Sequence, residues 1–173
     1  MTKIRLASPL QQDSIVDGPG IRMVLWTQGC EHHCPGCHNP KTHDRNGGTL
    51  YDVEDCIEQI MAAPLQTGLT LSGGEPFLQA EALIPIAQAA KARQWSLWAY
   101  SGFTFEQLMT DTTKRPLLEL LDVLVDGKFV EALKDYRLKF KGSKNQRIID
   151  VQASLKQNKV ILSSYDDINN QIE

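Results

Sequence analysis

The stretch Cys30-Glu31-His32-His33-Cys34-Pro35-Gly36-Cys37 holds three of the four cysteines in this 173-residue chain, at CxxxCxxC spacing. Thiolates set this close together on a loop suit a soft or borderline metal centre. A simple iron–sulfur protein normally supplies four cysteines to each cluster, whereas this stretch supplies three. The sequence therefore predicts a metal centre at Cys30, Cys34 and Cys37, with one coordination position that no nearby cysteine fills.

The cysteine spacing alone is compatible with more than one kind of metal centre. A zinc ion completed by His32, His33 or His38 would have the Cys₃His coordination that is typical of closed structural sites. A 4Fe–4S cluster held by three thiolates would leave one iron open to a substrate or cofactor, which favours a catalytic cluster. Disulfide bonds are disfavoured, because the chain has the features of a cytosolic protein and the bridges would close very short loops.

Composition predicts one folded domain over residues 1–173, in which residues 163–173 form a frayed tail. Hydrophobic residues make up 42% of the chain, which is enough to bury a core. The sequence has no run of about 18 apolar residues and no apolar N-terminal block, so we expect a cytoplasmic protein without a membrane span. The formal net charge of −3 argues against nucleic-acid binding.

Positive charge is concentrated in one part of the chain. From Lys128 to Lys159 there are nine Lys or Arg residues against three acidic ones, a local balance of +6, which leaves −9 for the remainder. Both a solvated polar surface and a docking patch for an acidic partner protein are consistent with this distribution.

Short apolar runs alternate with helical patterns along the chain, which favours parallel βα units. We expect four strands, each ending in residues capable of chemistry, at Ile21–Thr27, Gly68–Ser72, Ser96–Tyr100 and Val123–Val125. Further strands are expected at Arg147–Val151 and Lys159–Leu162, and helical segments at Asp52–Pro64, Ala80–Gln94 and in part of 104–121. Because a closed eight-stranded barrel needs about 250 residues, the predicted fold is α/β, an incomplete and open parallel β/α barrel.

Two further features bear on the vacant metal position. Cys56 lies on the apolar stripe of the helix predicted over Asp52–Pro64, where an unligated cysteine behaves as a small hydrophobe rather than a ligand. The segment Gly73-Gly74-Glu75-Pro76 directly follows the second predicted strand. Its paired glycines let the backbone approach a ligand closely, and Glu75 offers an acceptor for a cationic amine.

The CxxxCxxC motif after the first strand and Gly73-Gly74-Glu75-Pro76 after the second together resemble the radical S-adenosylmethionine (SAM) superfamily. More narrowly, four segments resemble the family of proteins that activate anaerobic ribonucleoside-triphosphate reductase. They are Val16-Asp17-Gly18-Pro19-Gly20-Ile21-Arg22, Cys34-Pro35-Gly36-Cys37, Leu124-Val125-Asp126-Gly127-Lys128-Phe129 and Gly142-Ser143-Lys144-Asn145-Gln146. The resemblance covers about residues 14–150.

The resemblance implies a 4Fe–4S cluster whose three cysteine-bound irons leave the fourth to the amino and carboxylate groups of SAM. It assigns the methionyl ammonium to Gly73, Gly74 and Glu75.

Backbone of Gly36, Cys37 and His38 is then expected to cover the adenine. Asp126 and Lys128 match a DxK pattern with which related activases position the SAM carboxylate; an exposed lysine after a strand is the competing interpretation. The end of the third strand, Tyr100, is expected only to shape the pocket.

Loop histidines His32, His33 and His43 receive no specific role from the sequence.

The resemblance also implies a function. An external low-potential donor such as flavodoxin reduces the cluster, SAM is cleaved, and the resulting radical takes a hydrogen atom from a glycine of the anaerobic reductase. No general acid or base is needed, which fits the absence of paired carboxylates or a Ser/His/Asp arrangement in the sequence. The alternatives are activation of another glycyl-radical enzyme such as pyruvate formate-lyase, a radical SAM reaction on a small molecule, and a zinc-stabilised interaction module.

Overall fold

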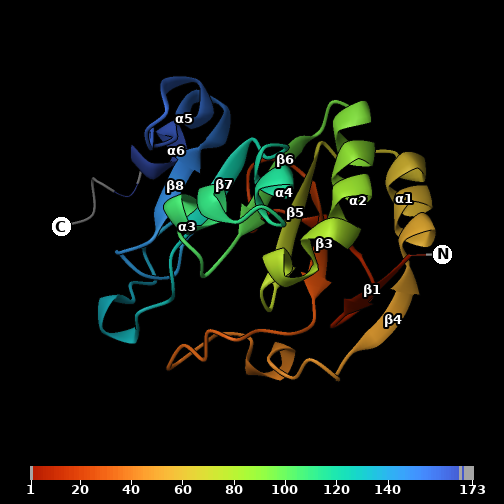
Figure 1. Ribbon diagram of the computed structural model, residues 1–173, viewed down its shortest axis with the longest axis horizontal. Helices are drawn as coiled ribbons and strands as arrows, with labels where there is room; N and C mark the ends of the chain where they lie inside the picture. Colours follow the sequence, from red (N-terminus) through yellow and green to blue (C-terminus); the bar gives the residue numbers. More distant parts are fainter. Residues whose placement is uncertain (1, 168, 170–173) are drawn as a thin grey trace.

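The computed structural model describes residues 2–167 and 169, in which eight strands form one open sheet (Figure 1). The strand order is β4-β1-β3-β5-β6-β7-β8, and β2 pairs with β3 outside this path. The strands are β1 Lys3–Leu6, β2 Gln11–Ser14, β3 Arg22–Thr27, β4 Thr49–Asp52, β5 Gly68–Gly73, β6 Ser96–Tyr100, β7 Val123–Asp126 and β8 Arg147–Asp150.

The centre of the sheet matches the prediction. Strands β3, β5, β6 and β7 are the four expected ones, and each pairs in parallel with the next. The open parallel β/α architecture is therefore confirmed for the part of the sheet whose strand ends carry the motifs.

The edges of the sheet differ from the prediction. The pairs β1–β3, β1–β4, β2–β3 and β7–β8 are antiparallel. Strands β1, β2 and β4 were not expected, because each is only four residues long and β2, Gln11–Ser14, is entirely polar. The strand expected at Lys159–Leu162 was wrong: this segment makes only one bridge, between Ile149 and Leu162.

The helices are α1 Val53–Ala62, α2 Ala80–Ala92, α3 Phe105–Thr110, α4 Arg115–Leu118, α5 Val151–Gln157 and α6 Ser164–Asp167. Three 3₁₀ turns lie at η1 Pro40–Thr42, η2 Pro76–Gln79 and η3 Glu131–Leu133. Helix α3 starts at a capping box formed by Thr104 and Gln107, and Asp150 caps α5, which the sequence did not predict. Among the described helices, none combines the length and the apolar character needed to cross a bilayer.

Apolar side chains pack on both faces of the sheet. The larger core lies on the face covered by α1 to α4, and it includes the fully buried Cys56, as the helical stripe predicts. On the other face a smaller cluster forms around Trp98, Val125 and Ile148, against which Phe140 and Tyr165 pack. This second face leads to the carboxyl ends of the parallel strands, where the chemistry-bearing loops gather.

Arg22 is fully buried at the start of β3 and holds three segments together. Its guanidinium donates to the Pro19 carbonyl (3.0 Å), to Oγ1 of Thr70 (2.8 Å) and to the carbonyls of Leu69 and Ser96 (2.9 and 2.6 Å). Burial lowers the pKa of Arg22 to about 10. The turn at Asp17–Gly20 is thereby fixed against β5 and β6.

The segment expected to be a frayed tail contains α6, whose Asp166 is buried and paired with Lys141 at 2.8 Å. The side chain of Asn169 accepts a hydrogen bond from the Lys139 backbone N–H and donates to its carbonyl. Residues 168 and 170–173, which are also part of that expectation, lie outside the described residues.

Candidate metal and cofactor site

A cavity of about 530 Å³ lies where the four parallel strands end. Its lining includes Cys30 after β3, Gly73 at the end of β5, Tyr100 at the end of β6 and Gly127 after β7. Ligand sites of α/β folds form at this end of a parallel sheet. The convergence of four strand ends on one mouth, which the βα pattern predicts, is present in the structure.

Cys30, Cys34 and Cys37 all line this cavity as free, partly buried cysteines. Burial is the main cause that raises the pKa of the Cys30 thiol, so a thiolate there needs compensation from a cation such as a metal. Cys37 Sγ lies 3.4 Å from the backbone N–H of Asn39 and 3.3 Å from Nε2 of His43. Donors placed this way are the kind that tune iron–sulfur clusters.

The donor set consists of three thiols that come from one loop and line one cavity. In residues 2–167 and 169, no three His, Cys, Asp or Glu side chains are arranged so that they could hold one metal ion. A structural zinc ion requires four ligands around one point, whereas a 4Fe–4S cluster takes one thiolate per iron and so accepts thiolates spread around a larger body.

The glycines after β5 lie against the loop that carries the cysteines. Gly73 has φ +103°, and a Cβ built on it would lie 2.4 Å from the backbone nitrogen of Thr27. A Cβ on Gly74 would lie 2.3 Å from the carbonyl oxygen of Gly29, the residue before Cys30. Because no side chain fits there, backbone of the Gly-Gly pair forms this part of the cavity wall.

Glu75 is buried and does not line the cavity. Its Oε1 lies 2.7 Å from Nε2 of His32 and accepts from the Gly102 N–H at 2.8 Å, and Ser101 Oγ donates to both carboxylate oxygens. The carboxylate therefore joins the cysteine loop to the residues that follow β6.

His32 is a residue whose place the sequence did not reveal. Its ring packs edge-on against Phe103 at 4.6 Å, and its side chain is only 7% exposed. The sequence assigns His32 no specific role, because its partner Glu75 lies 43 residues away. Only the tertiary structure brings the two together.

Asp126 and Lys128 are not brought to the cavity. Side chains alternate along a strand, so Asp126 shares the helix-facing side of β7 with the buried Leu124. There it accepts from the Phe105 N–H at the start of α3 (2.8 Å) and pairs with Arg147. Lys128 lies just beyond the strand with an exposed side chain.

Gly36 and His38 lie in the loop that bears the cysteines, and His38 is part of the cavity lining with Cys37. The His38 ring packs edge-on against Phe129, with ring centroids 4.9 Å apart. Gly36 has φ +72°, and a Cβ there would lie 2.8 Å from the Glu131 carboxyl carbon. The loop after β7 thus packs on the cysteine loop and closes one side of the cavity.

That closing wall also contains Phe140, Lys141, Gly142 and Gln146. Gln146 Oε1 accepts from the Gly142 N–H at 2.8 Å, and its Nε2 donates to the Gly127 carbonyl at 3.0 Å. The sequence gives no sign that Lys141 faces the cavity. A buried lysine in an irregular loop has no periodic signal by which it could be found.

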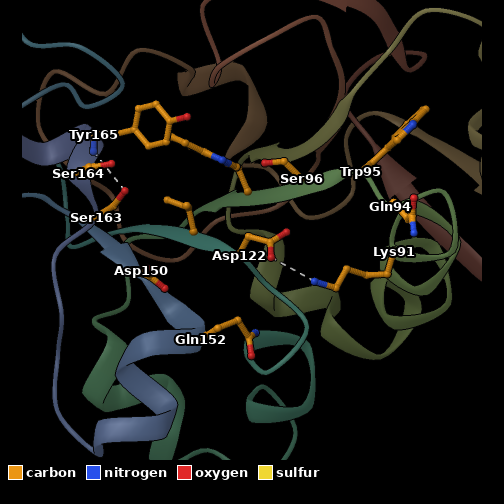
Figure 2. A pocket seen from close by; sticks show the side chains of 12 residues that line it. Lys91, Gln94, Trp95, Ser96, Asp122, Asp150, Gln152, Ser163, Ser164 and Tyr165 are labelled. Atoms are coloured by element: carbon orange, nitrogen blue, oxygen red, sulfur yellow. Dashed lines mark hydrogen bonds and ion pairs between the residues drawn. The ribbon is translucent and has the colours of Figure 1, made fainter.

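A second hollow, of about 590 Å³, lies at the other end of the strands, where β6 and β7 begin (Figure 2). Some of its polar side chains bind one another or the backbone: Lys91 pairs with Asp122 at 3.2 Å, and Asp122 also accepts from the Leu97 N–H. The hollow lies at the amino ends of the parallel strands, the end that in folds of this kind contributes to stability rather than to ligand binding.

Comparison with known proteins agrees with the chemistry of the thiolate-lined cavity. Residues 16–149 match the family model described as "4Fe-4S single cluster domain". One structural neighbour, described as the crystal structure of QueE from Escherichia coli, has a TM-score of 0.47 and 12% identity over 72% of this chain and 71% of that one.

Curated relatives match over most of their length. The anaerobic ribonucleoside-triphosphate reductase-activating protein of Haemophilus influenzae is 37% identical over 78% of this chain and 90% of that protein. The Escherichia coli K12 protein of the same name is 35% identical over 76% and 90%. The phage T4 protein of that name is 34% identical over 77% and 86%. The chain therefore belongs to the family of anaerobic ribonucleoside-triphosphate reductase-activating proteins, which are radical SAM activating enzymes.

Proposed function

We propose that this chain activates an anaerobic ribonucleoside-triphosphate reductase by generating a glycyl radical on it. The observation that carries the proposal is the meeting, in one open cavity, of three thiols and a paired-glycine wall at the ends of adjacent parallel strands. The names of the curated relatives indicate the reductase as the partner, and the three thiols indicate a 4Fe–4S cluster as the cofactor.

Cys30, Cys34 and Cys37 would each bind one iron of a 4Fe–4S cluster, and the backbone at Gly73 and Gly74 would receive the amino-acid end of SAM. When bound, the cluster supplies an electron for reductive cleavage of SAM, and the radical chemistry that follows removes a hydrogen atom from a glycine Cα.

The chain's own residues would orient SAM and shape the cavity around it. The backbone of Gly36 to His38 is proposed to cover the adenine; Cys37 and His38 line the cavity, and Phe129 packs edge-on against the His38 ring with centroids 4.9 Å apart. Glu75 does not line the cavity and acts indirectly. Its bonds to His32, Ser101 and Gly102 hold the cysteine loop against the ends of β5 and β6. Tyr100 shapes the wall, and burial raises the pKa of its phenol far above the usual range, so it stays protonated.

The open mouth fits a substrate that is part of another protein. A glycine in a partner chain has to enter as an extended segment, and a cavity closed by this chain alone would exclude it. The proposal also requires an external low-potential electron donor; a flavodoxin is one protein of this kind.

The test is anaerobic reconstitution with iron and sulfide, followed by metal analysis and incubation with SAM and reductant. We expect about four irons per chain and formation of 5′-deoxyadenosine, both lost together in a Cys34→Ser variant. A colourless protein that takes up one zinc ion, unfolds with chelators and never cleaves SAM would instead identify a zinc-stabilised module and overturn the proposal.

A further inference from the structure

Lys141 is a buried cation inside the candidate SAM site. Its side chain is 7% exposed, yet it belongs to the lining of the thiolate cavity. It is the one Lys or Arg among the described residues that line this cavity. A charged side chain is rarely buried unless it has a partner or a ligand. Lys141 has a buried partner in Asp166 and also faces the cavity.

The contacts of Lys141 leave part of its hydrogen-bonding capacity for a ligand. Nζ donates to the Gln146 carbonyl at 2.9 Å and to Asp166 Oδ1 at 2.8 Å. An ammonium group has three N–H donors, and these two acceptors are the ones it has in the described part of the chain. The third donor is left for a group inside the cavity.

Elements from the end of the chain hold Lys141 in place. Asp166 of α6 is itself buried, and Tyr165 packs on Phe140, the residue before Lys141, with ring centroids 6.0 Å apart. Phe140 has φ +65°, a left-handed conformation that a phenylalanine adopts only when its surroundings enforce it. The loop is therefore fixed by tertiary contacts in a shape that points Lys141 toward the cavity.

We propose, resting on the function proposed above, that Lys141 is the specificity-determining cation that binds the carboxylate of the amino-acid end of SAM. Asp166 is its positioning residue. A charge-assisted hydrogen bond from a buried ammonium suits a carboxylate, whereas the adenosine end of the ligand carries no anionic group. This assignment replaces Lys128, the residue that the DxK pattern suggests, because Lys128 is exposed and is not part of the cavity wall.

The test compares two ligands that differ in the group Lys141 is proposed to bind. S-Adenosylhomocysteine carries the amino-acid carboxylate, and 5′-methylthioadenosine lacks the amino-acid group. Binding of each to the anaerobically reconstituted protein is measured by calorimetry. Lys141→Met should weaken S-adenosylhomocysteine binding about 10- to 100-fold and leave 5′-methylthioadenosine within about twofold. Lys141→Arg, which keeps the charge, should restore most of the loss.

Two further variants control for the loss of one positive charge and for poor folding. Lys156→Met removes an exposed lysine of α5 and serves as the charge-matched control. Lys141→Met alone leaves the buried Asp166 carboxylate without a cation, so this variant could fold poorly. The double variant Lys141→Met/Asp166→Asn also removes that carboxylate. It should show the same selective loss of S-adenosylhomocysteine binding.

Equal weakening of both ligands by Lys141→Met, or a selective loss in Lys128→Met and none in Lys141→Met, would overturn this inference alone. Wild-type protein that is folded but takes up no cluster and binds neither ligand would overturn the proposed function, and the inference with it.

Discussion

Gly74 has no room for any side chain, since a Cβ there would meet the Gly29 carbonyl at 2.3 Å. Gly74→Ala should therefore push the Gly-Gly turn away from the cysteine loop, with a cost of about 1–3 kcal/mol in the free energy of unfolding. We also expect a loss of SAM affinity. Calorimetric titration and chemical denaturation would check both; a variant with wild-type affinity and stability would contradict the close packing of these two loops.

His43 contacts a proposed cluster ligand, with Nε2 at 3.3 Å from Cys37 Sγ. A hydrogen bond donated to a ligating sulfur withdraws negative charge and favours the reduced cluster. His43→Leu should therefore make the midpoint potential of the cluster more negative while iron content stays near wild type. Potentiometric titration followed by EPR measures this, and His33→Leu is the control, because the His33 ring lies 6.0 Å from the His43 ring and is not bonded to a thiol in the described structure.

The three cysteines and the two glycines could be identified from the sequence, because the residues of each motif lie close together in the chain and are recognisable without the tertiary structure. His32 and Lys141 could not, since their significance depends on Glu75 and Asp166, which lie far away in the sequence. For Asp126 the sequence motif was misleading. Its motif suggested a ligand contact, and strand alternation turned it toward α3 and Arg147.

At the scale of elements, the parallel centre of the sheet was predictable and its edges were not. Strands β3, β5, β6 and β7 are apolar runs separated by helices or turn residues, which is the signal that a buried parallel strand leaves. Strands β1, β2 and β4, which add to the sheet on the β3 side, are four residues each, too short for an apolar pattern to identify them, and they are stabilised by pairing with their neighbours.

Arg22 joins the turn at Asp17–Gly20 to β5 and β6 through bonds to Pro19, Thr70, Leu69 and Ser96. Arg22→Met should cost about 2–4 kcal/mol, because several buried acceptors lose their donor at once. Arg22→Lys should recover only part of the loss, since an ammonium has fewer donors than a guanidinium. Denaturant unfolding of the three proteins measures this; equal stability would show that Arg22 does not hold the turn.

At the scale of the whole molecule, the basic region 128–159 is divided by the structure into a buried and an exposed part. Lys141 is buried within it, whereas Lys134, Lys139 and Lys144 present exposed side chains on the loop after β7. This loop packs on the cysteine loop at Gly36, so a protein docked on it would lie next to the cavity.

Reversal of Lys134, Lys139 and Lys144 to Glu should slow activation of the reductase about 10-fold at low ionic strength, because attraction to an acidic partner surface is removed. The difference should shrink as salt is added. Reversal of Lys156 and Lys159 on the α5 side is the control, and the two effects are compared per reversed charge. Rates measured across a salt series that do not differ between the two variants would leave the loop as ordinary solvated surface.

EPR shows whether this cavity generates a radical on a glycine of the partner protein. The reconstituted protein is mixed anaerobically with SAM, reductant and anaerobic ribonucleoside-triphosphate reductase, and the spectrum is recorded. We predict a glycyl radical signal on the reductase that requires SAM and disappears with Cys30→Ser. Cleavage of SAM without any such signal on the reductase would contradict the account.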